Sequence, residues 1–481
     1  MIRDVINHSS RFTSHAFILH NLPMIVDSAY IRSFLIILLA LITLLGMFIV
    51  GKTLSQVQSR LAIALALGFV IFVAAFFNTQ VALHVLIFSM LLSPEIVIAE
   101  TSAREVTIRI DDLILAIISF TWLAKMTINK ELTALRDTPL NAPIFAYIAI
   151  CAFSTALGVV LGKVSPLSGF FFVLKYSEYF LVYLMVVNLL SNEQQARGFI
   201  IAMLVTCTIV SLYGISQIPS GRRVSTPFEG ESGEPGTFGG YLVLMMALAL
   251  AFLVYAESQK QRVLFAGLAV IMLLPLLFTL SRASFMAFFP MFFTLLFFSR
   301  RKKTLAILLA FAILVGPFLM PQYVINRIRY TFEEQAGSTR IGSIALEGSA
   351  SARIESWKKV LTKKWPARPL FGHGVTGAGF IDGQYPRVLA ETGALGLFLF
   401  LWLLWKIFSN ALLVYRAAED DFSQILSLSL MAGLVGLMFH AMTANTFIIV
   451  RIMEPFWFLT GIVMMLPAME MEKEVREGKV Q

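Results

Sequence analysis

The sequence predicts an all-α polytopic membrane protein with about 12–14 transmembrane helices. Apolar residues make up 58% of the 481 positions and charged residues only 14%, whereas soluble proteins carry about 25% charged residues. The apolar residues form blocks of roughly 17–25, the length that crosses about 30 Å of hydrocarbon as a helix. The alternating pattern of membrane β-strands is absent from the sequence. This composition excludes a water-soluble globule, a disordered chain and a nucleic-acid-binding domain.

The candidate spans follow one another along most of the chain. Residues 1–30 lack the uninterrupted apolar core of a cleavable signal peptide. The span 81–98 is weakened by Pro94 and Glu95, and the spans 262–280 and 283–299 are close enough to form a tight hairpin. In chain order, the spans are 32–51, 61–77, 81–98, 112–128, 140–162, 166–190, 198–218, 237–256, 262–280, 283–299, 304–320, 388–414, 422–445 and 451–467.

These spans divide the chain into five segments. They are an N-terminal cytoplasmic or interfacial segment (1–31), a first transmembrane bundle (32–320) that includes a periplasmic loop (219–236), a long periplasmic loop (321–387), C-terminal transmembrane helices (388–467) and a cytoplasmic tail (468–481).

Lysine and arginine set the expected orientation. The net charge is +9, and cytoplasmic loops of membrane proteins carry an excess of these residues. The densest basic run, Arg300 to Lys303, is therefore expected in the cytoplasm, and alternation places both termini there. The loop 219–236, the turn at Ser281 and Arg282, and the loop 321–387 then face the periplasm. Both cysteines lie inside apolar blocks, so no disulfide framework or metal site follows from them.

All three of these external segments carry arginines against the orientation rule. Arg222 and Arg223 are adjacent, and they are either part of a solvated loop or a clamp for a phosphate or pyrophosphate. Arg282 stands between two apolar stretches. It either extends to the lipid headgroups or forms the floor of an outward-facing cavity aimed at an anionic lipid headgroup.

The long loop contains a basic amphipathic helix and ends in a group of ionisable residues. Ile354, Trp357 and Leu361 fall on one stripe, which predicts a helix lying on the membrane surface. The ionisable residues precede and enter the next span: His373, Asp382, Tyr385, Arg387 and Glu391. Taken singly, His373 is typical of a structural histidine and Asp382 of a turn or cap residue. Their clustering beside the external arginines favours a site.

A further pair of charges lies within a span. Lys175 and Glu178 are three residues apart, which places them on one helix face, so they either form a structural ion pair or serve a function within the membrane.

Several motifs, in this order, make the chain resemble the bacterial O-antigen ligase and polymerase superfamily. They are LKYSEYFLVYLMVVNLL, GTFGGYLVLMMALAL, FTLSRASFMAFF, SARIESWKKVL with PLFGHGVTG, DGQYPRVLAETGALGL and ANTFIIVRIMEPFWFLTG. The resemblance as a whole covers roughly residues 140–465. The resemblance implies an inverting, metal-independent glycosyltransferase without a cofactor, active on the periplasmic face of the bacterial inner membrane. Its donor would be an oligosaccharide on undecaprenyl pyrophosphate, and its acceptor another glycan or the lipid A core. Chain-length regulators and flippases are the implied protein partners.

One departure from the family pattern bears on the acceptor. Ligases of this family typically begin a His-Asn-x-Tyr-Leu motif with histidine, where this chain has Asp382 in DGQY. A polymerase of exopolysaccharide or O-antigen repeats is therefore favoured, with a ligase as the alternative. A lipid-linked oligosaccharide transporter is the alternative from a different class.

The resemblance and the charges together suggest roles for the site residues. Asp382 is the first candidate for the general base and His373 the second. Arg282, with Arg222 or Arg223, would neutralise the departing pyrophosphate. The remaining candidates are assigned to substrate binding or to holding the loop: Arg353, Tyr385, Arg387 and Glu391.

Overall fold

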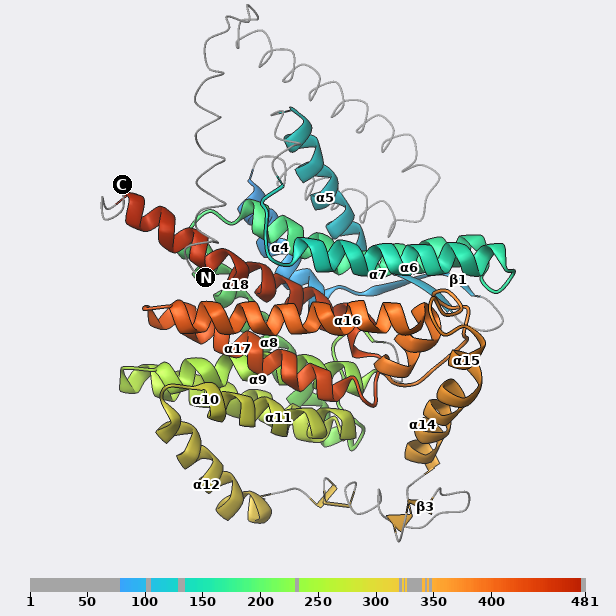
Figure 1. Ribbon diagram of the computed structural model, residues 1–481. Helices are drawn as coiled ribbons and strands as arrows, with labels where there is room; N and C mark the ends of the chain where they lie inside the picture. The colour runs from blue at the N-terminus through green and yellow to red at the C-terminus, as the bar shows by residue number, and fades with distance from the viewer. Residues whose placement is uncertain are drawn as a thin grey trace, which may run out of the picture. The chain divides into compact units, whose positions relative to one another are not determined.

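A computed structural model describes the chain from Asn78 onward, with gaps (Figure 1). All of these residues lie in the larger of the chain's two compact units, Ile71–Gln481. The described ranges are 78–100, 105–128, 135–229, 233–319, 322–323, 325–326, 340–341, 344–345 and 348–476. The N-terminal segment and the predicted spans 32–51 and 61–77 fall outside them.

The structure confirms the predicted fold class. Within the described residues, eight helices are long and apolar enough to cross a membrane. They are α6 (Asn141–Val160), α7 (Pro166–Leu189), α8 (Glu193–Gln217), α9 (Pro235–Tyr255), α10 (Gln259–Phe278), α16 (Gln384–Ala417), α17 (Asp421–His440) and α18 (Val450–Arg476). Four further apolar helices are α4 (Thr79–Leu92), α5 (Ile110–Ile128), α11 (Arg282–Phe298) and α12 (Lys302–Leu319).

Local capping interactions explain where several helices begin. Asn192 accepts a hydrogen bond from the Gln195 amide at the start of α8, and Asp420 accepts one from Ser423 at the start of α17. Ser258 forms a reciprocal capping box with Gln261 at the start of α10. Each of these side chains satisfies an amide that the helix itself leaves unpaired.

The predicted span 81–98 differs from the structure. The helix α4 ends at Leu92, and Glu95–Glu100 instead forms strand β1, paired antiparallel with β2 (Glu105–Arg109). Pro94 supplies no amide hydrogen for a continuing helix, which accounts for the break. A second short hairpin joins β3 (Arg340–Ile341) to β4 (Ile344–Ala345).

The helix α9 lies at the centre of the described bundle. It contacts α8, α10, α11, α17 and α18, and 94% of its span is buried. The turn between α10 and α11 is as tight as predicted. The two helices nevertheless take different neighbours, since α10 packs on α8 while α11 packs on α17.

The helix α16 contains a break at Gly393, where φ is 71° and ψ is −170°. A side chain there would collide with the carbonyl of Leu370, so only glycine fits. The amide of Ala394 donates to the Pro369 carbonyl (2.8 Å), and that of Leu395 donates to the Leu370 carbonyl (3.3 Å). The break therefore joins a short helical segment, 384–392, to the long apolar part of α16.

The predicted amphipathic helix is present as α14 (Gly348–Lys359), η2 (Val360–Lys364) and α15 (Trp365–Ala367). The segment η2 is a π-helical turn, which adds a residue per turn and rotates the face that follows. As a result Val360 is buried against Ile381, while Leu361, predicted to share the apolar stripe, is exposed.

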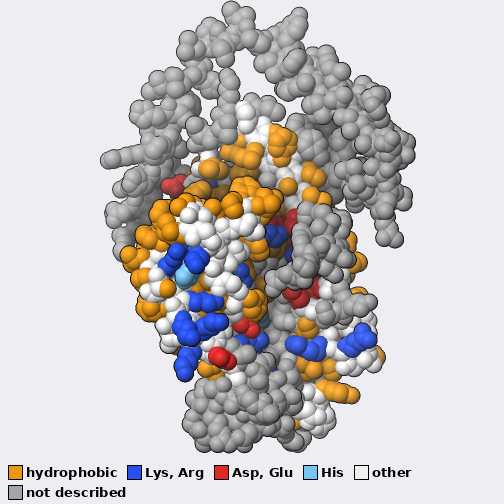
Figure 2. Space-filling model, turned by 90° about the vertical axis from the view of Figure 1, so that its right-hand side faces the viewer, with side chains coloured by type: hydrophobic (Ala, Val, Ile, Leu, Met, Phe, Trp, Pro, Cys, Tyr) orange, Lys and Arg blue, Asp and Glu red, His pale blue; other side chains and the backbone are white. Residues whose placement is uncertain are grey.

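The bundle has two chemically different ends. We define the loop end as the one where α8, α10 and α17 end and α9, α11 and α16 begin. Figure 2 views the molecule from this side and shows Lys and Arg side chains gathered on the face. At the opposite, basic end, Arg301 donates to the Tyr255 carbonyl (3.0 Å) and pairs with Asp421 (2.7 Å), and Arg300 donates to the Arg416 carbonyl (3.2 Å).

Candidate functional site

The structure brings two of the predicted arginine segments together at the loop end. The guanidinium of Arg223 donates through Nε to the Thr279 carbonyl (2.9 Å). Beside it, the Val224 amide donates to the Phe278 carbonyl (3.1 Å). The loop 219–236 is thereby fastened to the α10–α11 turn, so Arg223 and Arg282 belong to neighbouring segments.

A buried histidine joins the start of α11 to the end of α17. The Ser284 hydroxyl lies 3.3 Å from Nε2 of His440, and Thr446 Oγ1 lies 2.8 Å from Nδ1 of the same ring. Ser284 stands two residues after Arg282, and its hydroxyl also donates to Ser281 (2.9 Å). This contact fixes the helix turn that carries Arg282 against α17.

The segment around Asp382 docks onto the loop that follows α17. The Gln384 amide donates to the Ala441 carbonyl (2.9 Å), and the Asn445 side chain donates to the Ile381 carbonyl (3.0 Å). The Gln384 side chain accepts from the Phe447 amide (3.1 Å). Residues on both sides of Asp382 are therefore held close to the end of α17, to which the turn of Arg282 is also attached.

Asp382 forms an ion pair with Arg353 of α14. Arg353 Nε donates to Asp382 Oδ2 over 3.1 Å, and both side chains remain about one-third exposed. Both residues are candidates from the sequence, but nothing in the sequence predicts that they pair. The arrangement presents a carboxylate of fixed orientation that is open to a ligand.

His373 occupies a more structural position. Its Nε2 donates to the Lys364 carbonyl (2.9 Å), and its amide donates to the Ala390 carbonyl (3.0 Å). The ring is half-buried. Because the carbonyl takes the hydrogen on Nε2, only Nδ1 of the neutral ring is left to act as a base.

Glu391 is the buried centre of a hydrogen-bond network. It accepts from the Tyr176 hydroxyl (3.1 Å), from Arg387 Nε (3.1 Å) and from the Thr376 amide (3.2 Å). Tyr385 donates its hydroxyl to the Met438 carbonyl (2.7 Å). Of the two roles considered for these residues, their contacts fit holding the loop better than touching a ligand.

A cleft of about 1020 Å³ opens on the loop 219–236. Ligand sites of drug-sized molecules span about 300–1,000 Å³, so this volume suits a substantial ligand. Its lining combines the two adjacent arginines with two aromatic rings and polar side chains: Tyr213, Gln217, Arg222, Arg223, Phe228 and Glu229.

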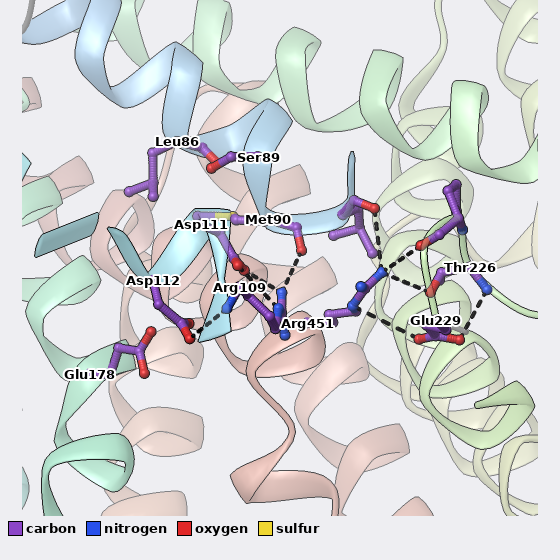
Figure 3. Close-up of polar contacts among 12 residues, drawn as sticks. Leu86, Ser89, Met90, Arg109, Asp111, Asp112, Glu178, Thr226, Glu229 and Arg451 are labelled. Carbon is purple, nitrogen blue, oxygen red and sulfur yellow. Dashed lines mark hydrogen bonds and ion pairs between the residues drawn. The ribbon is translucent and has the colours of Figure 1, made fainter. Parts of the chain in front are cut away.

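The turn Thr226–Glu229, which forms one wall of this cleft, is anchored from inside the protein by Arg451 (Figure 3). Arg451 is buried at the start of α18 and donates to Thr226 Oγ1 (3.0 Å) and to the Pro227 carbonyl (2.9 Å). Its Nε faces Glu229 Oε1 at 3.9 Å, while Glu229 Oε2 accepts from the amides of Thr226 (3.2 Å) and Glu234 (2.9 Å). Burial raises the pKa of the Glu229 carboxyl above its ordinary value.

A second group of buried charges adjoins this anchor. Arg109 pairs with Asp111, as Figure 3 shows, and both arginines of the figure line one small cavity of about 90 Å³. Lys175 pairs with Asp112 (2.7 Å) and with Glu178 (2.8 Å), so the structure has the ion pair that was one of the two alternatives for Lys175 and Glu178. The Arg109–Asp111 pair and the bridging position of His440 are not predicted by the sequence. In the sequence, Arg109 and Asp111 are visible only as charges at the end of an apolar block, and that pattern does not indicate which residue each one contacts.

Comparison with known protein families finds a match to one part of the chain. Residues 267–394 match the model of the O-antigen ligase family. The matched stretch includes Arg282, Arg353, His373 and Asp382, and it ends before the anchor at Arg451. A search of curated proteins finds no match to the chain.

Proposed function

We propose that the chain is a membrane glycosyltransferase that polymerises repeat units of an exopolysaccharide or O-antigen, since residues 267–394 match the model of the O-antigen ligase family. The donor is a glycan on undecaprenyl pyrophosphate, and the acceptor is a second lipid-linked glycan. The observation that carries the proposal is the meeting of the Arg223, Arg282 and Asp382 segments at the loop end.

The arginines would act on the leaving group. Pyrophosphate departs with growing negative charge, so its release needs charge neutralisation more than a proton. Arg222 and Arg223 line the cleft, and the contact between Arg223 and Thr279 holds that cleft next to the turn of Arg282. Guanidinium groups bind phosphate oxygens through several N–H donors at once, which suits this task.

Asp382 would act as the general base on the acceptor hydroxyl. Its carboxylate stays accessible, and Arg353 holds one of its oxygens at 3.1 Å. Attack from the face opposite the pyrophosphate inverts the anomeric carbon. His373 is the weaker candidate because its Nε2 hydrogen is directed to a backbone carbonyl.

The loop end would face the periplasm. Support comes from the opposite end, which holds Arg300–Lys303, the densest basic run of the sequence, as cytoplasmic loops do.

The second candidate is a ligase that transfers the glycan to a lipid A core, and the description of the matched family favours it. Asp382, at the position where ligases typically carry histidine, favours the polymerase. The two activities differ in the acceptor and share the donor chemistry.

The test uses purified protein in nanodiscs supplied with the lipid-linked repeat unit of its own host. A polymerase gives a ladder of longer lipid-linked glycans, whereas a ligase gives product only after lipid A core is added. Asp382→Ala should lower the rate by about 10²–10⁴. The matched control is Asp421→Ala at the basic end, where the aspartate is 37% exposed against 36% for Asp382 and also pairs with an arginine.

Equal rates for Asp382→Ala and Asp421→Ala would remove Asp382 as the base. If an authentic donor yields no product with either acceptor, the lipid-linked glycan or the lipid A core, the proposed glycosyl transfer is refuted.

A further inference from the structure

Phe228 combines two features that are rare in one residue. Its backbone is left-handed, with φ at 62°, a conformation that costs free energy for any residue with a Cβ. Its side chain is also 52% exposed, although a phenyl ring gains free energy from burial. Folding alone would favour glycine or asparagine at such a position.

The protein interior holds this turn in place. Arg451 bonds to Thr226 and Pro227, the two residues before Phe228, and the Glu229 carboxylate accepts from Thr226 and Glu234. Strained residues persist where the surroundings over-determine them, and such residues cluster at functional sites. Here the buried anchor fixes the turn with its ring held outward, so the ring is placed for an external contact.

The ring is part of the wall of the arginine-lined cleft. Tyr213, also exposed, lines the same cleft with Arg222 and Arg223. In a polyprenyl-pyrophosphate glycan, the pyrophosphate is bonded directly to the anomeric carbon of the first sugar. A pyrophosphate held by the arginines therefore carries that sugar ring beside it, within the same cleft. The C–H face of a sugar is apolar and lies flat on an aromatic ring.

We infer that Phe228 is the binding platform for the first sugar of the lipid-linked glycan, the sugar attached to the pyrophosphate. This inference rests on the proposed function. It means that the cleft selects donors by the identity of the sugar attached to the pyrophosphate. The arginines bind the charge common to all carriers, and the aromatic ring distinguishes a carrier that bears a sugar from a bare one.

The test compares two probes on purified protein in nanodiscs: undecaprenyl pyrophosphate and the same carrier bearing its repeat unit. Two variants separate the ring from the backbone. Phe228→Ala removes the ring and keeps a Cβ in the left-handed conformation, while Phe228→Gly removes both. Both variants should lose about tenfold in affinity for the glycan-bearing carrier and keep the wild-type affinity for the bare one. Phe228→Tyr should restore the difference.

Thermal unfolding supplies the readout that a structural role would not give. Phe228→Gly should melt at or above the wild-type temperature, because glycine relieves the left-handed backbone while the lost side chain was already about half exposed. A lower melting temperature with unchanged affinities would make Phe228 a packing residue and overturn the inference. An equal loss of affinity for both probes would also overturn it, because the ring would then not read the sugar.

Failure of the inference and failure of the proposed function give different results. If the Phe228 variants discriminate as the wild type does while Arg223→Ala abolishes glycan transfer, the platform is refuted and the transferase stands. If the wild type transfers no glycan from an authentic donor, the proposed function fails.

Discussion

Replacing Arg451 with alanine should lower the free energy of unfolding by about 3–5 kcal/mol, the usual cost of breaking a buried ion pair by removing one partner. The guanidinium is 2% exposed and donates to Thr226 Oγ1 and the Pro227 carbonyl. Its removal leaves the buried Glu229 carboxylate without its cation, 3.9 Å away in the wild type. The adjoining carbonyl of Pro227 also loses a donor in a place that water reaches poorly.

The chain offers a matched control at the basic end. Arg197 pairs with Glu193 over 2.5 Å across one turn of α8, and both side chains are exposed. Arg197→Ala should cost only about 1–2 kcal/mol, because water solvates the released carboxylate and the contact of the guanidinium with the Phe422 ring (4.1 Å to the centroid) is worth about 0.5–1 kcal/mol. The measurement is unfolding of both variants in mixed micelles by added dodecyl sulfate, with tryptophan fluorescence as the readout and refolding on dilution as the check of reversibility.

The pH dependence of the Arg451→Ala penalty provides an independent check. Burial already raises the pKa of Glu229 above 4.5, and loss of Arg451 removes one of the interactions that oppose this rise. The folded protein then holds the Glu229 proton more tightly than the unfolded chain does. Stability therefore falls as the pH rises from about 4.5 toward neutrality. The penalty should be largest at neutral pH and shrink in acid.

Two results would refute this account of Arg451. The first is a cost for Arg451→Ala no larger than that for Arg197→Ala. The second is a penalty that stays constant with pH. Adding Glu229→Gln to Arg451→Ala should recover part of the lost stability at neutral pH, because the stranded charge is removed.

The same unfolding assay checks two more residues. Gly393→Ala should lower the free energy of unfolding by about 3 kcal/mol or more, because the added Cβ would collide with the Leu370 carbonyl. The control is Gly162→Ala, which is also at positive φ but has nothing within 4 Å of the added Cβ and should cost about 1 kcal/mol. Similar costs for the two variants would contradict the steric argument. Tyr176→Phe should cost about 1–3 kcal/mol by removing a donor to buried Glu391, and a neutral result would exclude that bond.

Hydropathy predicted the helices well because bilayer thickness sets their length. The predicted spans 140–162 and 166–190 agree with α6 and α7 to within two residues at each end. The prediction was weaker where a local event overrides the average. The helix of the predicted span 81–98 ends early, before Pro94, and a strand follows it. The π-helical turn at Val360–Lys364 changes which residues face the protein, so the apolar stripe predicted from regular helical periodicity does not extend to Leu361.

The candidate site was predicted as a set of residues but not as a set of contacts. Arg353 and Asp382 are 29 positions apart, and Arg451 and Thr226 are 225 apart. Periodicity describes neighbours within a few turns, so pairings at such separations depend on how helices pack. The Lys175–Glu178 pair could be expected from the sequence because its two members share one helix face.

The central position of α9 has a consequence for biogenesis. The chain is synthesised from its N-terminus, so α9 enters the bilayer before α10, α11, α17 and α18 exist to surround it. Until they arrive, its surface must be tolerated by lipid, although 94% of its span is finally buried. Its mean hydropathy of 2.2 equals that of α8, which is only 56% buried. The hydropathy of α9 is therefore high enough for the helix to enter lipid before its neighbours are made. A polar substitution that the finished core tolerates would still impair membrane insertion of α9.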